Sequence, residues 1–493
     1  MMHDAEKSDP SIVPGKSVNN AGLPAAEPME GRGGTERNAD RQSTDLTQSR
    51  TAVSQALARI REAATRNQKE KLTALLHHIT IDCLRVAFFG LKKRAAAGVD
   101  EMTWAAYAND LERRLGDLHG RIHRGAYRAL PSRRVYIPKS DGRQRPLGIA
   151  ALEDKIVQAA VVIILTPIYE AEFLGFSYGF RPGRGQHDAL DALAFGIKAR
   201  KVCWIVDADI RSFFDTISHE WLIKFVEHRV GDRRIVRLIQ KWLRAGVLQD
   251  GERVETVEGT PQGAVISPLL ANVYLHYVYD LWVQAWRTHR ATGDTIVVRY
   301  ADDVIAGFQH QRDAERFLGD LDSRLARFGL CLHPEKTRLI EFGKFAAERR
   351  QARGLGKPHT FDFLGFTHYC ARKKDGTGFQ LGRKTARKRM RAKLREIKET
   401  LKRHDDKPLH EQGEWLAGVL RGYFAYFAVP TNTPSLDAFR HHVEVRWFKA
   451  LRRRSQRHNL SWPKMRRLVD RYLPRVRVLH PWPEERFRVR YSQ

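Results

Sequence analysis

Apolar positions divide the chain into parts with different patterns. From Thr51 to Lys93, apolar residues recur every three or four positions, which predicts a helical N-terminal extension. Between residues 94 and 370, short β-branched runs such as Val202–Ile205 and Ile296–Val298 stand among helical stretches. The order is neither a strict βαβ repeat nor an all-β meander, so we expect an α+β fold there.

The two ends differ from this middle part. Residues 1–50 contain no aromatic residue and little apolar periodicity, which predicts a disordered tail. Residues 371–475 are predicted to form a helical domain, and residues 476–493 a basic C-terminal tail. The strongest helical patterns are Thr385–Leu401, Glu411–Tyr426 and Leu436–Arg454.

Charge points to a polyanionic partner. The chain has a formal net charge of +29 and a pI of about 10.2. Residues 371–493 hold 32 Lys and Arg against 12 Asp and Glu, a net charge of +20. Nucleic acid fits this excess, and no membrane segment is expected because no run of 18 apolar residues occurs. The aromatic residues among these cations could stack on bases or form the core of a helical domain.

Two adjacent carboxylates, Asp302 and Asp303, stand between apolar runs that end at Val298 and begin at Val304. This pattern predicts two strands joined by a tight turn with both acids at its tip. Adjacent carboxylates repel each other unless a cation lies between them, and oxygen ligands suit Mg²⁺. The alternative is an ordinary solvent-exposed turn, in which Asp residues are common. A catalytic interpretation therefore requires a second acidic site.

That second site follows the strand-like run that starts at Trp204 and delivers Asp209. Three carboxylates from two strands can hold two Mg²⁺ ions, one activating a 3′-hydroxyl and the other stabilising pyrophosphate. Asp207 would share a strand face with Asp209. A third string, Gly259–Asn272, predicts a loop running into an apolar helix, where Gln262 beside Gly263 would let the backbone approach a nucleotide; an ordinary helix start is the alternative.

These three strings, in this order, resemble the palm motifs of reverse transcriptases, and the Tyr300–Asp303 form with Thr260–Asn272 is similar to those of group II introns. The resemblance implies a right-hand polymerase, with fingers and an antiparallel palm at 94–370 and a basic helical thumb or maturase domain at 371–475. Further strings that resemble the family are Ala97–Asp100, Ile137–Lys139, Arg145–Ile149, Ser177–Arg184, Gly329–Leu330, Glu335–Thr337 and Phe363–Phe366.

The resemblance also implies roles. Asp209, Asp302 and Asp303 would be the catalytic metal ligands for two Mg²⁺ ions. Phe214 would exclude a ribose 2′-hydroxyl, with a core Phe as the alternative. The remaining residues expected to bind the dNTP are Lys139, Arg145, Gln262 and Lys336, although Lys336 could also be a solvated surface residue. The expected primer grip is Phe363, Leu364, Gly365 and Phe366.

The expected function is RNA-directed DNA synthesis on intron RNA from a DNA primer or target, with help in splicing. The alternatives are a non-catalytic RNA-binding maturase, which intact acidic residues disfavour, and a reverse transcriptase domesticated for defence or DNA repair. The four cysteines form no C-x-x-C pair, so neither zinc nor a disulfide framework is expected. No endonuclease segment is expected after the thumb, and the expected location is cytoplasmic, in ribonucleoprotein or nucleoid.

Overall fold

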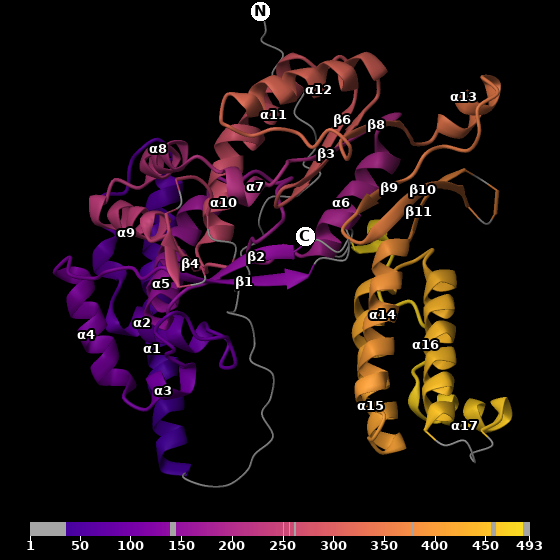
Figure 1. Cartoon of the computed structure of the whole chain (residues 1–493). Coiled ribbons are helices and arrows are strands. Elements are labelled where there is room, and N and C mark those ends of the chain that lie inside the picture. The colour runs from indigo at the N-terminus through magenta and orange to yellow at the C-terminus, as the bar shows by residue number, and fades with distance from the viewer. Residues whose placement is uncertain are drawn as a thin grey trace, which may run out of the picture.

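A computed structural model of the chain describes residues 36–138, 144–249, 251–255, 257–260, 263–373, 375–376, 378–454 and 460–486. Figure 1 shows a larger part built from helices and sheets and a smaller helical part formed by α14–α17 near the C-terminus. The fold is a mixture of helices and mainly antiparallel sheets followed by a helical region, which agrees with the α+β prediction.

The helices are α1 (Glu36–Arg66), η1 (Leu76–His78), α2 (Ile81–Gly90), α3 (Trp104–Ala108), α4 (Leu111–His123), α5 (Leu152–Glu170), α6 (Gln186–Ala199), α7 (Phe213–Thr216), α8 (His219–Arg229), α9 (Arg233–Arg244), α10 (Ser267–Leu275), η2 (His276–Asp280), α11 (Leu281–His289), α12 (Gln311–Ala326), α13 (Ala346–Ala352), α14 (Arg387–Arg403), α15 (Leu409–Phe427), α16 (Thr433–Arg453) and α17 (Trp462–Tyr472). The strands are β1 (Ser132–Pro138), β2 (Gln144–Ile149), β3 (Trp204–Asp209), β4 (Val247–Gln249), β5 (Glu252–Val254), β6 (Thr295–Tyr300), β7 (Asp303–Phe308), β8 (Arg338–Glu341), β9 (Phe361–Phe363), β10 (Phe366–Arg372) and β11 (Phe379–Thr385).

The central sheet has the strand order β6-β7-β3-β8, and all its pairs are antiparallel. Its strands are buried on both faces: Val206 belongs to the large core that includes α12, whereas Ile205 belongs to the core shared with α6 and β9–β11. Burial on both faces explains why these strands appear as continuous apolar runs. The helix α6 approaches closely, because a Cβ at Gly196 would lie only 3.1 Å from Ile296 Cδ1.

A second sheet, β2-β1-β4-β5, lies below the central one in Figure 1, next to the helices of the N-terminal third. The helices α1, α2 and α5 pack against one another there. The strand β1 pairs antiparallel with β2 and parallel with β4, so it fixes the whole sheet to the segment that follows α9.

The prediction of a disordered tail over 1–50 is wrong from residue 36 onward, because α1 begins at Glu36. Ser49, only 2% exposed, donates a 2.7 Å hydrogen bond to Asp82 of α2. A polar side chain therefore holds this turn of the helix in place, and the apolar periodicity that signals a packed helix is weak there. Residues 1–35 lie outside the described part of the chain.

The third sheet, β11-β10-β9, leads into the C-terminal helices. The hairpin of β10 and β11 crosses residue 371, so the helical domain begins at Arg387 and not at the predicted boundary. Its helices α14–α17 enclose a separate core in which Tyr423, Phe424, Trp447 and Phe448 are buried. Base stacking and core packing are the two interpretations of the aromatic residues in this region. Core packing is confirmed for these four rings.

The C-terminal segment is packed against the rest of the protein over 476–486, which corrects the predicted tail. Leu479 donates a 2.9 Å backbone hydrogen bond to Ala428 of the helical domain. His480 stacks on His187 of α6, with ring centroids 3.9 Å apart, and Arg486 forms a 2.9 Å ion pair with Asp191. The segment thus joins the helical domain to α6, and residues 487–493 lie beyond the described part.

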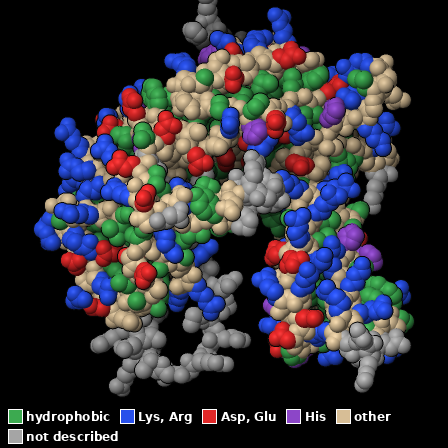
Figure 2. All heavy atoms as spheres, in the orientation of Figure 1, with side chains coloured by type: hydrophobic (Ala, Val, Ile, Leu, Met, Phe, Trp, Pro, Cys, Tyr) green, Lys and Arg blue, Asp and Glu red, His purple; other side chains and the backbone are tan. Residues whose placement is uncertain are grey.

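The surface is strongly cationic. Figure 2 shows Lys and Arg side chains over much of the visible face, including α14 and the outer helices of the larger part. In α14, Arg387, Lys388, Arg389 and Arg391 are all exposed. None of the helices in the described segments combines the length and apolar character needed to cross a bilayer.

Candidate active site

The predicted acidic hairpin is confirmed. The strand β6 ends at Tyr300, which pairs with Asp303 at the start of β7, and the turn between them contains Ala301 and Asp302. Ala301 has a φ of 56°, in the left-handed region that non-glycine residues rarely adopt. The turn is thus a strained two-residue connection, and it brings both carboxylates to the end of the sheet.

Asp209 lies directly beside this hairpin. It is the last residue of β3, and its Cα pairs with that of Asp303 across the antiparallel strands. Side chains at such paired positions point to the same face, with Cβ atoms about 4.5–5.5 Å apart. Asp207 shares this face, as predicted, and forms a 2.9 Å ion pair with Arg338 of β8. Asp207 pairs with Ile305, so Asp209 is the acidic residue directly opposite Asp303.

The two aspartates open into a pocket of about 390 Å³. Lys336 reaches Asp209 from the segment before β8, with 2.5 Å between its Nζ and the carboxylate. The pocket is lined by Asp207, Ala208, Asp209, Asp303, Val304, Ile305, Glu335, Lys336, Arg338, Asp362, Phe363 and Leu364. Asp209, Lys336 and part of the predicted primer grip therefore share one cavity.

The electrostatics of the pocket disfavour the simultaneous ionisation of Asp209, Asp302 and Asp303 without a bound cation. Desolvation is the largest of the causes that raise the pKa of Asp303 to about 7, and the charges of Asp302, Asp209 and Asp207 act in the same direction. Burial also raises the pKa of Asp302, although the nearby charge of Arg145 partly offsets it. The acidic side chains are close enough to oppose one another's ionisation, so a cation would stabilise their charged forms.

As they stand, no three Asp, Glu, His or Cys side chains of the described residues converge closely enough to hold a metal ion. The backbone nevertheless places Asp209 opposite Asp303 and Asp302 next to it. All three are hard oxygen donors of the kind that Mg²⁺ prefers. In their donor chemistry the three residues therefore fit a divalent metal site, and in this structure Asp209 is paired with Lys336.

Buried Arg299 holds the turn of the hairpin. It is fully buried, and its guanidinium donates bonds of 2.7 and 2.6 Å to the carboxylate of Asp280 in η2. It also donates to the carbonyl of Ala301 in the turn itself, at 3.0 Å. The remaining contacts of its guanidinium are with Asn272 and Ser177.

This network was missed in the sequence. Gly179 adds a second constraint, because a Cβ at that position would lie 2.3 Å from the nitrogen of Ala301. The available signal was the charge of Arg299 inside an otherwise apolar strand, since a fully buried arginine needs a partner. The sequence did not indicate that the partner is Asp280.

Phe214 lies at the start of α7 and is half-buried, with its ring 5.4 Å from that of buried Phe213. The carbonyl of Phe214 accepts a 2.8 Å hydrogen bond from the nitrogen of Thr260. A Cβ on Gly259 would lie 2.9 Å from the same carbonyl. The loop that contains the predicted ligand Gln262 is therefore anchored beside Phe214, and the string does run into a helix, α10; Gln262 itself lies outside the described residues.

The cationic dNTP ligands are only partly described. Arg145 lies exposed on β2, opposite Ile137 of β1, and its charge lowers the pKa of Asp302, so it lies near the acidic site. Lys139 follows the end of β1 but lies outside the described part of the chain.

The predicted primer grip contains two kinds of residue. Phe363 and Phe366 are buried in the core beside α6, and of these two only Phe363 also lines the pocket. Leu364 and Gly365 form the tight turn between β9 and β10, both with positive φ, and Leu364 lines the pocket. Tyr426 of α15 donates a 2.7 Å hydrogen bond to the carbonyl of Leu364 and fixes this turn against the helical domain.

A carboxylate pair at a hairpin tip beside a third carboxylate on the neighbouring strand is typical of metal-dependent phosphoryl-transfer enzymes. Residues 137–368 match the family model described as reverse transcriptase (RNA-dependent DNA polymerase). The chain is 36% identical to Protein YkfC of Escherichia coli over 277 residues, which cover 49% of this chain and 71% of that protein.

Two further matches concern introns. The chain is 36% identical over 222 residues to the group II intron-encoded protein LtrA of Lactococcus lactis, covering 45% of this chain and 37% of that protein. A shorter match, 32% identical over 108 residues, covers 21% of this chain and 14% of Nuclear intron maturase 2 of Arabidopsis thaliana. The chain belongs to the reverse transcriptase family, and within that family it groups with the proteins encoded by group II introns.

The raised pKa of Asp303 gives a stability prediction. The folded protein disfavours the ionised carboxylate, so in metal-free buffer containing EDTA the Asp303→Asn variant should melt above wild type at pH 8. The increase should be small, because Asp303 is exposed and solvent screens its charge. The difference should vanish below about pH 4, where Asp303 is protonated in the folded and unfolded states. Mg²⁺ should raise the melting temperature of wild type more than that of the variant. The control is Asp322→Asn, at an exposed position, which should melt at the same temperature as wild type. The same result for Asp303→Asn at pH 8 would contradict the prediction.

The Arg299 network predicts that stability and activity can be separated. Arg299→Met leaves Asp280 buried and unpaired, which should cost about 3–5 kcal/mol of unfolding free energy. Adding Asp280→Leu should restore much of that stability but not polymerase activity, because the carbonyl of Ala301 still lacks its donor. Arg229→Met, at another buried arginine remote from the turn, should lose stability with a smaller loss of activity per folded molecule. Recovery of activity in the double variant would exclude this role for Arg299.

Proposed function

We propose that the chain copies RNA into DNA at the pocket between Asp209 and the hairpin of Asp302 and Asp303. The observation that carries the proposal is the direct pairing of Asp209 with Asp303, in a chain that belongs to the reverse transcriptases. The substrates in this proposal are an intron RNA template, a DNA primer or target, and dNTPs. Two Mg²⁺ ions would lower the pKa of the primer 3′-hydroxyl and neutralise the charge of the departing pyrophosphate.

The protein's own groups supply binding and orientation. The 3′-oxygen of the primer forms a bond to the α-phosphorus while the bond from that phosphorus to pyrophosphate breaks. Arg145, with Lys139, would hold the triphosphate, since paired cations offset its concentrated charge. Lys336 stands beside the site and would be free to donate a proton to pyrophosphate once Asp209 turns to its metal ligands.

In the proposed right-hand architecture, the β2-β1-β4-β5 sheet forms the fingers, the β6-β7-β3-β8 sheet the palm, and α14–α17 the thumb. The turn of Leu364 and Gly365 would guide the primer end through its backbone, because the side chains of Phe363 and Phe366 are buried. Its contact with Tyr426 links this grip to the thumb.

The thumb offers the nucleic acid a cationic path that begins at the active site. The charge of Arg389, at the start of α14, lowers the pKa of Asp303, so this helix starts near the acidic pocket. Exposed Lys and Arg continue along α14. We propose that this surface holds the template–primer duplex and the intron RNA, and that the protein thereby assists splicing as a maturase.

Primer extension on an RNA template with Mg²⁺ and dNTPs tests the proposal. The Asp302→Ala/Asp303→Ala variant should make no product and should bind RNA about as well as wild type, with affinity that falls steeply as salt rises. The variant Asp320→Ala/Asp322→Ala on α12 is the matched control and should retain activity. If wild type binds RNA but never extends a primer, the protein is a non-catalytic maturase.

Sugar selection tests the role of Phe214. The Phe214→Ala variant should incorporate ribonucleotides at least about tenfold more readily relative to dNTPs, because the ring that blocks a 2′-hydroxyl is gone. Phe213→Ala is the control: this buried ring should cost about 3–5 kcal/mol of stability without changing sugar preference. Unchanged selectivity in Phe214→Ala would show that Phe214 is a core residue only.

A further inference from the structure

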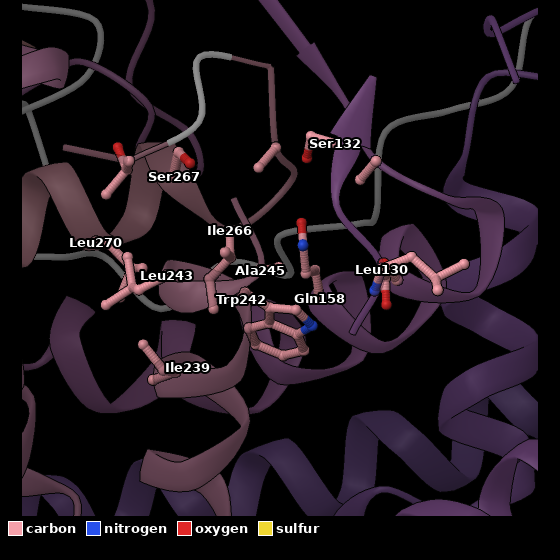
Figure 3. Close-up of a pocket in the computed structure, with 14 residues that line it drawn as sticks. Leu130, Ser132, Gln158, Ile239, Trp242, Leu243, Ala245, Ile266, Ser267 and Leu270 are labelled. Atoms are coloured by element: carbon pink, nitrogen blue, oxygen red, sulfur yellow. The ribbon is translucent and has the colours of Figure 1, made fainter. Parts of the chain in front are cut away.

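A small cavity with both polar and apolar walls lies behind the predicted nucleotide site, between β1, α5, α9 and the loop that enters α10. Figure 3 shows Gln158 pointing into it, with Ser132 above, Ile266 to the left and Trp242 below. About 10 Å³ is open to the centre of a water-sized sphere, which is room for about one water molecule. The cavity is therefore too small for a substrate, and its importance lies in what its walls hold.

Asp154, four residues before Gln158 on α5, holds the fingers side of the cavity. Its carboxylate accepts a 3.0 Å hydrogen bond from the nitrogen of Leu130, just before β1, and a second from the hydroxyl of Tyr127. That hydroxyl in turn accepts a 2.8 Å bond from Trp242 of α9. Asp154 is only 2% exposed, so these partners are what keep it in place. Asp154 thus fixes the start of β1. This strand leads to Lys139 and pairs with β2, which carries Arg145.

Gln158 holds the loop that enters α10, on the other side of the cavity. Its Oε1 accepts a 3.0 Å hydrogen bond from the nitrogen of Val265, three residues after Gln262. The same loop is held at its other end by the bond from Thr260 to Phe214, and a Cβ on Gly263 would meet the carbonyl of Gly148 on β2 at 3.0 Å. The loop is therefore placed between the proposed sugar gate and the strand of Arg145, and Gln158 is its side-chain anchor on α5.

Residues four apart lie on the same face of a helix, so a single face of α5 holds both segments. We propose that Asp154 and Gln158 are positioning residues for the incoming nucleotide, which set the distance between the triphosphate-binding strands and the loop of Gln262. The helix suits this role because it is deeply buried along most of its length and so gives both contacts a rigid base. The inference rests on the proposed polymerase function, but neither residue lines the acidic pocket.

The two contacts should act on nucleotide binding more than on the chemical step. Gln158→Leu removes the acceptor for Val265 and should raise KM for dNTP about tenfold, with a smaller change in kcat and none in primer–template affinity. Gln158→Glu retains an acceptor oxygen and should stay within about threefold of wild type. Asp154→Asn loses one of its two hydrogen bonds and should raise KM in the same direction.

The matched control is Gln412→Leu in the helical domain. Gln412 is likewise buried and bonded to the main chain: its Nε2 donates to the carbonyl of His404, and its Oε1 accepts from the indole nitrogen of Trp447. It should lose similar stability without a change in KM for dNTP. If Gln158→Leu and Gln412→Leu behave alike, or KM is unchanged in Gln158→Leu, the positioning role is wrong.

If Gln158→Leu does not fold, Asp154→Asn decides in the same assay, and an unchanged KM there overturns the inference. Wild-type protein serves as the reference for the proposed function itself. Absence of extension by wild type would defeat that function, whereas normal extension by wild type and unchanged KM in the variants would defeat this inference alone.

Discussion

The ion pair of Arg299 and Asp280 is the interaction on which the site depends. Both side chains are fully buried, so each would be costly without the other. Arg299 sits at the end of β6 and bonds to the carbonyl of Ala301, so the same guanidinium that neutralises Asp280 also holds the strained turn. The turn in turn fixes Asp302 and Asp303 against β3. A contact inside the core thus determines the geometry of carboxylates that lie at the surface.

The acidic pocket illustrates how function opposes stability. Three carboxylates and Asp207 crowd one end of the sheet, and desolvation together with their repulsion raises the pKa of Asp303. The surrounding protein compensates locally with Arg338 on Asp207 and Lys336 on Asp209. Lys336 therefore stabilises the site in the absence of metal, while its position beside Asp209 suits a later role in catalysis. Behind the pocket, α5 connects the strands and the loop that would surround the nucleotide.

Local patterns predicted what local sequence determines. The acidic hairpin was found because its strands are short apolar runs, and the predicted helix Thr385–Leu401 differs from α14 by two residues at each end. The start of α1 was missed because the burial of Ser49 depends on Asp82, which is remote in sequence. The docking of 476–486 was missed for the same reason, since Arg486 finds Asp191 nearly three hundred residues earlier. The partners of Arg299 likewise come from other elements, and a charge within a strand does not reveal them.

The central claim is that a rigid hairpin presents Asp302 and Asp303 to Asp209 so that all three can bind divalent metal. A crystal structure with Mn²⁺, a primer–template and an incoming nucleotide, using anomalous scattering to locate the metal, tests this most directly. The account predicts anomalous peaks coordinated by Asp209 together with the hairpin, Lys336 moved away from Asp209, and the contact of Arg299 with Ala301 unchanged. Manganese bound elsewhere, or Asp209 still paired with Lys336 in a complex ready to react, would contradict it.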